Sequence, residues 1–321
     1  MSELAQQIVD GDRRALARGI TLVESTRADH REEADALLTE VMPSTGSAVR
    51  VGISGAPGSG KSTLIEALGL HLIESGRTVA VLAVDPSSTR TGGSILGDKT
   101  RMGDLTRREE AFVRPSPTGG TLGGVTRRTR EAMLLCEAAG FEVVLVETVG
   151  VGQSEVAVEG MVDCFLLLIA PGGGDELQGI KRGIMELADI VVVNKADGAL
   201  EGVAASTASD YTNALRLVRP KAMAWSPRVV LCSALEGRGI DECWSAIEEH
   251  QQVLEASGEL NGRRAEQAKA WMWAELSAAL LERLRADPAA AEAASRLESD
   301  VAAGRVPPTV AAARVLQALG G

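Results

Sequence analysis

A glycine-rich segment near the start of the chain carries the clearest chemical signal. The phosphate-binding pattern G-x-x-x-x-G-K-[ST] is matched by Gly55, Ala56, Pro57, Gly58, Ser59, Gly60, Lys61 and Ser62, with Thr63 following. Backbone N–H groups of such a loop turn inward around phosphates, and the N-terminus of the next helix adds partial positive charge. Lys61 is predicted to reach the β/γ-phosphates, and the Ser62 hydroxyl to bind Mg²⁺. The segment therefore predicts a site for a nucleotide with Mg²⁺.

A second motif indicates which base is bound. The pattern N-K-x-D is matched by Asn194, Lys195, Ala196 and Asp197. The carboxylate of this motif accepts hydrogen bonds from the N1–H and the exocyclic amine of guanine. Adenine has no such donor pair, so it would leave Asp197 unpaired at a cost of roughly 1–3 kcal/mol. A later strand ends at Ser233, Ala234 and Leu235, a loop whose N–H groups commonly contact guanine O6. The sequence predicts GTP or GDP, not ATP.

A third motif is expected near the metal and the γ-phosphate. Many GTPases have D-x-x-G here, with the carboxylate at the Mg²⁺ shell and the glycine N–H at the γ-phosphate. This chain has Glu147 and Gly150, and Val151 stands where a water-orienting glutamine usually follows the glycine. We predict that Glu147 reaches the metal directly or through water, and that intrinsic hydrolysis is slow.

Other polar residues follow strand ends or lie in glycine-rich segments. Asp85 ends the second strand and is a candidate for the Mg²⁺ water shell. Asp98 lies in a glycine-containing stretch and is a candidate metal contact that depends on the bound nucleotide, with a solvated loop as the alternative. Three glycines at 172–174 suggest a hinge. Beyond them, Lys181 and Arg182 are candidate cations for the transition state or a simple surface pair.

The elements that must position these residues alternate between strands and helices. Short runs rich in Val, Ile and Leu predict strands at 49–53, 79–84, 143–147, 164–170, 190–194 and 229–232, and a helix is expected at 62–73. Such runs suit a mostly parallel sheet with helices on both faces, an α/β P-loop NTPase fold. We expect this domain to span residues 46–252.

Helical extensions are predicted on both sides of that domain. Residues 1–45 are expected to hold two helices, with a capping box at Asp29 and Glu32 for the second. Residues 253–321 predict helices at 265–285, 289–302 and 309–319. This C-terminal region is either an intramolecular cap or an oligomerisation arm.

Composition limits the classes of function. The net charge of −11 and the 2% aromatic content argue against a nucleic-acid or membrane-surface binder. Four cysteines without C-x-x-C spacing and three histidines far apart in sequence predict reduced core thiols and no His/Cys metal site. The first residues show no apolar signal stretch and the chain has no 18-residue apolar run, so we expect a cytoplasmic protein.

Several longer motifs resemble one family. The stretches V-D-P-S-S, T-G-G-S-I-L-G-D-K-T-R-M, E-T-V-G-V-G-Q-S-E, G-G-G-D-E-L-Q-G-I-K and N-K-A-D look like those of the methylmalonyl-CoA mutase-associated GTPases of the MeaB/ArgK type, closely over about residues 45–250. The resemblance implies a homodimeric G-protein chaperone that couples GTP hydrolysis to cofactor loading and protection of an adenosylcobalamin-dependent acyl-CoA mutase, with the C-terminal helices as the dimerisation arm. It further implies that Ser62, Asp85, Asp98 and Glu147 surround Mg²⁺, and that Lys181 supports partner-stimulated hydrolysis.

Three alternatives remain at this point. A metal-insertion GTPase would need a Cys/His cluster, which we expect this chain to lack. An ATP-dependent kinase or transport-associated ATPase conflicts with N-K-x-D. A structural protein with vestigial nucleotide binding conflicts with the intact set Lys61, Ser62, Glu147 and Asp197.

Overall fold

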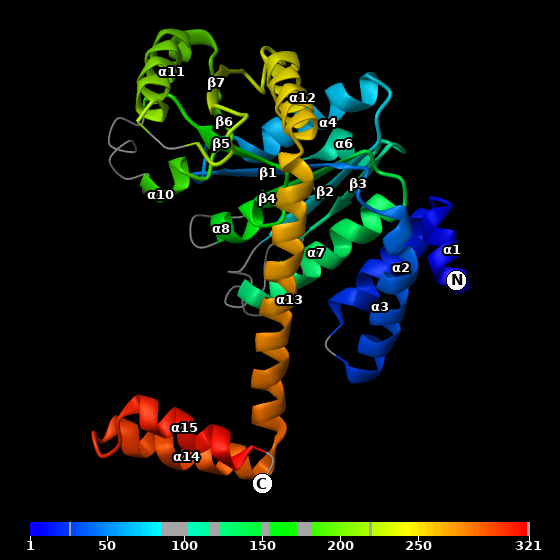
Figure 1. Cartoon of the computed structure of the whole chain (residues 1–321). Coiled ribbons are helices and arrows are strands. Elements are labelled where there is room, and N and C mark those ends of the chain that lie inside the picture. The colour runs from blue at the N-terminus through cyan, green and yellow to red at the C-terminus, as the bar shows by residue number, and fades with distance from the viewer. Residues whose placement is uncertain are drawn as a thin grey trace. The chain divides into compact units, whose positions relative to one another are not determined.

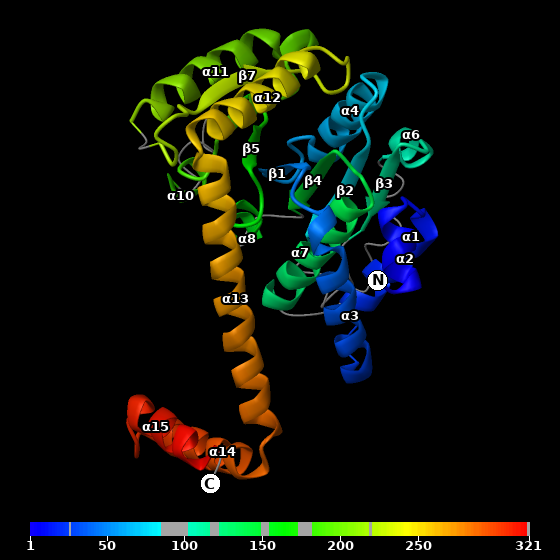
Figure 2. The same ribbon diagram turned by 45° about the vertical axis from the view of Figure 1, so that its right-hand side comes forward.

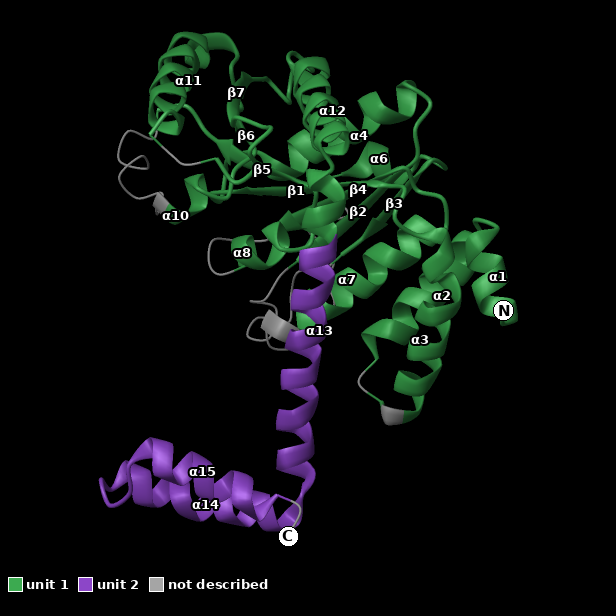
Figure 3. Ribbon diagram, in the orientation of Figure 1, with its two compact units in different colours: residues 1–264 green, residues 265–321 purple. Residues whose placement is uncertain are grey.

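The computed structural model describes residues 1–25, 27–84, 102–115, 122–148, 154–172, 182–217 and 220–319. Two compact units are distinguished, residues 1–264 and residues 265–321 (Figure 3). The division falls inside helix α13 (Glu259–Ala286). The finer partition into residues 1–45, 46–252 and 253–321 stays a prediction.

A seven-stranded parallel sheet forms the centre of the first unit, with the strand order β3-β2-β4-β1-β5-β6-β7 (Figure 1). The strands are β1 (Val49–Gly55), β2 (Val79–Val84), β3 (Ala111–Arg114), β4 (Val143–Thr148), β5 (Cys164–Ile169), β6 (Ile190–Val193) and β7 (Arg228–Leu231). Every residue of β2, β4, β5 and β6 is buried. The strands are continuous apolar runs because both faces of the sheet are covered. The predicted fold class, a mostly parallel α/β P-loop NTPase sheet, is confirmed.

Helices cover the sheet on both faces (Figures 1 and 2). On one face, α4 (Lys61–Glu74) and α12 (Ile240–Ser257) pack against residues such as Val51, Leu166 and Val192. On the other, α11 (Glu201–Leu215) packs against Leu167 and Val193. There α7 (Leu122–Ala138) and α8 (Ser154–Glu159) lie over β2, β4 and β1. After the N-terminal segment this unit also contains the short helices α6 (Gly103–Thr106), α10 (Arg182–Met185) and η2 (Gly198–Leu200).

The N-terminal segment holds three helices where two were expected. They are α1 (Glu3–Val9), α2 (Arg13–Glu24) and α3 (Ala28–Val41), followed by the short η1 (Met42–Ser44). Asp12 caps α2 by accepting from the N–H groups of Arg14 and Ala15, which ends α1 and starts a new helix. The predicted capping box at Asp29 is wrong, because α3 begins at Ala28 and Asp29 binds the guanidinium of Arg27. These helices pack together and on α7.

The second unit is helical. It comprises most of α13 together with α14 (Pro288–Ala302) and α15 (Pro308–Ala318). Pro288 is the first residue of α14, where its missing N–H costs nothing, and the Asp287 side chain caps the helix at Ala290. Ala290, Ala293, Leu297 and Ala311 are buried where α14 and α15 pack on each other.

Candidate nucleotide-binding site

The glycine-rich loop lies between a buried strand and a helix, as the motif requires. It leaves β1 at Gly55 and enters α4 at Lys61, so the first N–H groups of α4 face the loop. Gly58 and Gly60 have φ of +84° and +94°, which only glycine adopts readily. The Lys61 ammonium donates to the carbonyl of Gly55 at 2.8 Å and approaches that of Ala56 at 3.4 Å. Its charge is thus held at the start of the phosphate loop.

Gly60 is required for a second reason. A Cβ at this position would lie 2.4 Å from the amide nitrogen of Asn194, well inside van der Waals contact. The phosphate loop and the N-K-x-D turn, 134 positions apart in sequence, therefore pack directly on each other.

Asn194 joins three loops at the end of the sheet. It is buried, with only 2% of its surface exposed. Its side-chain amide donates to the carbonyl of Ser59 at 3.0 Å, and its side-chain oxygen accepts from the N–H of Ala234 at 3.0 Å. Lys195, with φ of +60°, adds a bond from its ammonium to the carbonyl of Gly58 at 2.7 Å. These contacts fix the N-K-x-D turn relative to the phosphate loop.

The Asp197 carboxylate is oriented and still accessible. The Ser233 hydroxyl donates to its Oδ2 and also accepts from the N–H of Glu236 at 3.2 Å. An isolated antiparallel bridge between Ser233 and Arg238 closes this turn. Asp197 is half-buried and Leu235 is 82% exposed, so the carboxylate and the turn around it can contact a base.

Two oxygen ligands for a divalent cation lie together at the start of α4. The Ser62 hydroxyl donates to Oε1 of Glu147 at 3.3 Å, and Glu147 is only 4% exposed at the end of β4. A buried carboxylate beside a hydroxyl is a donor set that suits Mg²⁺. The longer side chain of glutamate at this position therefore reaches the Ser62 hydroxyl, and the residues present fit the metal.

Four predicted site residues lie outside the described part of the chain: Asp85, Asp98, Gly150 and Lys181. The other predicted site residues lie at the carboxyl ends of four parallel strands. The loop 55–63 follows β1, Glu147 lies at the end of β4, the turn 194–197 follows β6 and residues 233–235 follow β7. Parallel strands bring these ends to one edge of the sheet, the usual ligand edge of open α/β sheets.

Folding also gathers a group that the sequence did not suggest. The group consists of Cys164, Asp189 and His250, which are all buried. One potential metal-ligand atom from each of these residues lies within 4.8 Å of those of the other two. The expectation that the chain has no Cys/His cluster is therefore wrong. No spacing signal could have revealed it, because the three residues come from separate elements. The prediction of reduced core thiols is confirmed, since all four cysteines are free and buried.

Comparison with known proteins shows which family the chain belongs to. The model of the family described as "Methylmalonyl Co-A mutase-associated GTPase MeaB" matches residues 16–289. The chain belongs to the MeaB family. A probable GTPase of Mycobacterium tuberculosis is 57% identical over 98% of this chain and 94% of its own length. The mouse mitochondrial methylmalonic aciduria type A homolog is 49% identical over 97% of this chain and 77% of its own length.

A solved structure shares the architecture of this MeaB-family chain. A crystal structure entitled "LAO/AO transport system kinase" has a TM-score of 0.79 and 41% identity, and covers 98% of this chain and 96% of its own. Within the described part of the chain, no helix is both long and apolar enough to cross a membrane.

Proposed function

We propose that this protein binds GTP with Mg²⁺ and hydrolyses it slowly to GDP and phosphate. The observation that carries the proposal is the Asn194 side chain, which bridges the phosphate loop at Ser59 and the loop after β7 at Ala234. A nucleotide bound along these loops would meet Lys61 at its phosphates and Asp197 at its base. Family membership among named GTPases supports the same activity.

Residue roles in hydrolysis follow from the donors at the site. Lys61 would neutralise β/γ-phosphate charge, and Ser62 and Glu147 would hold the metal, with Asp85 and Asp98 completing its shell. Bound Mg²⁺ would stabilise the negative charge that develops on the phosphates. Because Val151 occupies the usual glutamine position, this chain would orient water poorly by itself. Lys181 is proposed to act when a partner stimulates hydrolysis.

The biological output is proposed to be the state of a partner enzyme. We infer a chaperone that gates cofactor loading and protection of an adenosylcobalamin-dependent acyl-CoA mutase. The family description names a mutase-associated GTPase, and the mouse relative carries the name of methylmalonic aciduria. Free, buried cysteines fit a reducing compartment such as the cytoplasm.

Hydrolysis assays test both parts of this proposal. GTP turnover by the pure chain should be slow, should rise at least about tenfold with the methylmalonyl-CoA mutase of the same organism, and should be undetectable with ATP. A ten-fold rise corresponds to about 1.4 kcal/mol of transition-state stabilisation. Stimulation should also be lost in Lys181→Ala while the basal rate stays within about twofold.

The outcomes separate the two parts. GTP turnover that the mutase leaves unchanged would contradict the chaperone role and leave the GTPase assignment in place. Equal turnover of ATP and GTP would contradict the base assignment at Asp197.

We further propose that the chain forms a homodimer through its C-terminal helices. Large apolar side chains of α13 are exposed on the single chain, with exposed fractions of 57% for Met272, 61% for Trp273, 44% for Leu276 and 51% for Leu280. Trp273, Leu276 and Leu280 follow the i, i+3, i+7 spacing of one helix face. An apolar stripe of this kind is usually covered by another chain.

Charge in this stripe should break the dimer. Leu280→Glu places two carboxylates in the interface and is expected to weaken association at least about 100-fold, since each buried leucine contributes roughly 1.5–3 kcal/mol. Ala278→Glu is the matched control, because residue 278 points away from the stripe. Light scattering after size exclusion should show a monomer for the first variant and a dimer for the second. A monomeric wild-type chain at micromolar concentration would refute the homodimer.

A further inference from the structure

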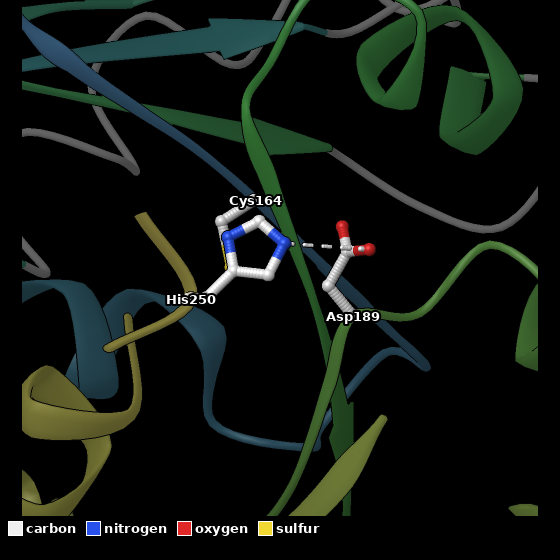
Figure 4. A group of neighbouring side chains, drawn as sticks. All are labelled: Cys164, Asp189 and His250. Atoms are coloured by element: carbon white, nitrogen blue, oxygen red, sulfur yellow. Dashed lines mark ion pairs between the residues drawn. The ribbon is translucent and has the colours of Figure 1, made fainter. Parts of the chain in front are cut away.

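A buried triad lies beneath the opposite edge of the sheet from the nucleotide site. Cys164 is the first residue of β5, Asp189 directly precedes β6, and His250 projects from α12 (Figure 4). Their exposed fractions are 1%, 2% and 0%. One ligand atom from each residue lies within 4.8 Å of those of the other two. Three different elements thus direct a sulfur, an oxygen and a nitrogen to one point.

The buried imidazole of His250 has unsatisfied ring nitrogens within the described part of the chain. Neither ring nitrogen has a hydrogen-bond partner among the described residues, although the side chain is fully buried. Nε2 is 3.7 Å from Oδ1 of Asp189, which is an ion-pair distance but too long for a hydrogen bond. The Trp225 ring contacts the imidazole edge-on at 5.0 Å between centroids and offers it no acceptor. Buried polar groups without partners are costly and rare, so something else is expected to satisfy this imidazole.

We propose that Cys164, Asp189 and His250 bind one zinc ion that is a resident structural metal. Thiolate, imidazole and carboxylate are the three ligand types that zinc takes in proteins, at roughly 2.0–2.3 Å, and water can fill a fourth position. Tetrahedral ligands at these bond lengths lie roughly 3.3–3.8 Å apart. The three ligand atoms now lie within 4.8 Å of one another, so they need to approach by only about 1 Å to reach that arrangement.

The position of Asp189 is already fixed for such a role. Its Oδ2 accepts from the N–H of Phe165 at 2.9 Å and from the Lys221 ammonium at 3.1 Å. Oδ1 faces His250 and lies 3.4 Å from the guanidinium of Arg263. Oδ1 is therefore the ligand atom, while Oδ2 holds the carboxylate in place.

Nearby charges are compatible with a divalent cation. Lys221 and Arg263 are paired with Glu159 at 3.1 and 3.7 Å as well as with Asp189. Zinc, the Cys164 thiolate, the two carboxylates and these two cations together carry a single positive charge. Burial raises the pKa of the Cys164 thiol, but a coordinating metal deprotonates a thiol directly.

Burial also decides the kind of metal. An ion enclosed by β5, β6 and α12 has no exposed ligand through which it could be handed to another protein. It would tie the amino ends of two central strands to α12, independently of the nucleotide. The proposed metal is thus part of the fold and not a cargo.

Metal content of the full chain tests this directly. The chain without a polyhistidine tag, produced in medium with zinc and desalted, should contain about one zinc per chain by mass spectrometry. Chain produced in cobalt medium should show a thiolate-to-cobalt charge-transfer band in the near ultraviolet. Cys164→Ser should lose that band and most of the metal. Cys136→Ser is the matched control, since Cys136 is equally buried but lies on α7, and it should keep both.

Two results would overturn the proposal. The first is wild-type chain with less than about one tenth of an equivalent of zinc and no cobalt band. The second is metal that Cys164→Ser retains at the wild-type level. Because the wild-type spectrum by itself decides whether a thiolate binds the metal, the test holds even where a variant fails to fold.

Discussion

Lys61→Ala is expected to weaken GTP binding by at least about 100-fold. Removing one partner of a desolvated charge pair typically costs roughly 3–5 kcal/mol, and each 1.4 kcal/mol is about tenfold in affinity. The ammonium now lies over the loop at 2.8 Å from the Gly55 carbonyl, so it is already positioned for phosphate. Titration with a fluorescent GTP analogue, checked by calorimetry with GTP, measures the loss.

The same substitution should hardly change the free energy of unfolding. Lys61 is half-buried, and water can replace its ammonium at the carbonyls of Gly55 and Ala56, so a change of only about 1 kcal/mol is expected. Lys269→Ala is the matched control, with an exposed lysine on α13, and should bind GTP normally. Unchanged affinity in Lys61→Ala would refute the assignment of the phosphate loop.

Asp197→Asn is expected to move base preference from guanine to xanthine. A carboxylate accepts from both the N1–H and the amine of guanine. An asparagine side chain accepts once and donates once, which matches the N1–H and the 2-oxo group of xanthine. Each mismatched pair costs roughly 1–3 kcal/mol, so the ratio of GTP to XTP affinity should fall about 100-fold or more. Competition of GTP and XTP against one labelled nucleotide measures this ratio.

Two further variants sharpen this experiment. Asp210→Asn changes an exposed aspartate on α11 and should leave the ratio unchanged. Ser233→Ala removes the hydroxyl that orients the carboxylate and should reduce GTP affinity by less than Asp197→Asn does, without favouring XTP. If Asp197→Asn kept full guanine selectivity, the base would have to bind elsewhere.

Local sequence patterns predicted most strands of the sheet but missed the edge strand β3. Strands that are buried on both faces, such as Val79–Val84, read as continuous apolar runs and were predicted at the observed bounds. β3 was missed because an edge strand of four residues, Ala111–Arg114, has only its first two buried. The N-terminal break at Asp12 was missed because apolar residues continue at helical spacing across it, although the Asp12 side chain caps a new helix.

The sequence by itself determined the family of the protein and predicted its nucleotide chemistry. Each motif of the nucleotide site is a short run of consecutive residues that supplies both the backbone conformation and the side chains of its part of the site. The phosphate loop, Glu147 and the N-K-x-D turn could therefore be predicted from local sequence. Family membership followed from the same stretches and is confirmed. Asp85, Asp98, Gly150 and Lys181 stay predictions, since they lie outside the described residues.

Only the tertiary structure decided how distant residues meet. Gly60 needs to be glycine because Asn194 lies against it. The sequence predicted Ser233 as a base contact, but only the fold shows that its hydroxyl bonds to the Asp197 carboxylate. The triad of Cys164, Asp189 and His250 is the clearest case, since 25 and 61 positions separate its members in sequence. Parallel strands and the helix packed on them bring together residues whose spacing carries no signal, because the crossovers between them have no fixed length.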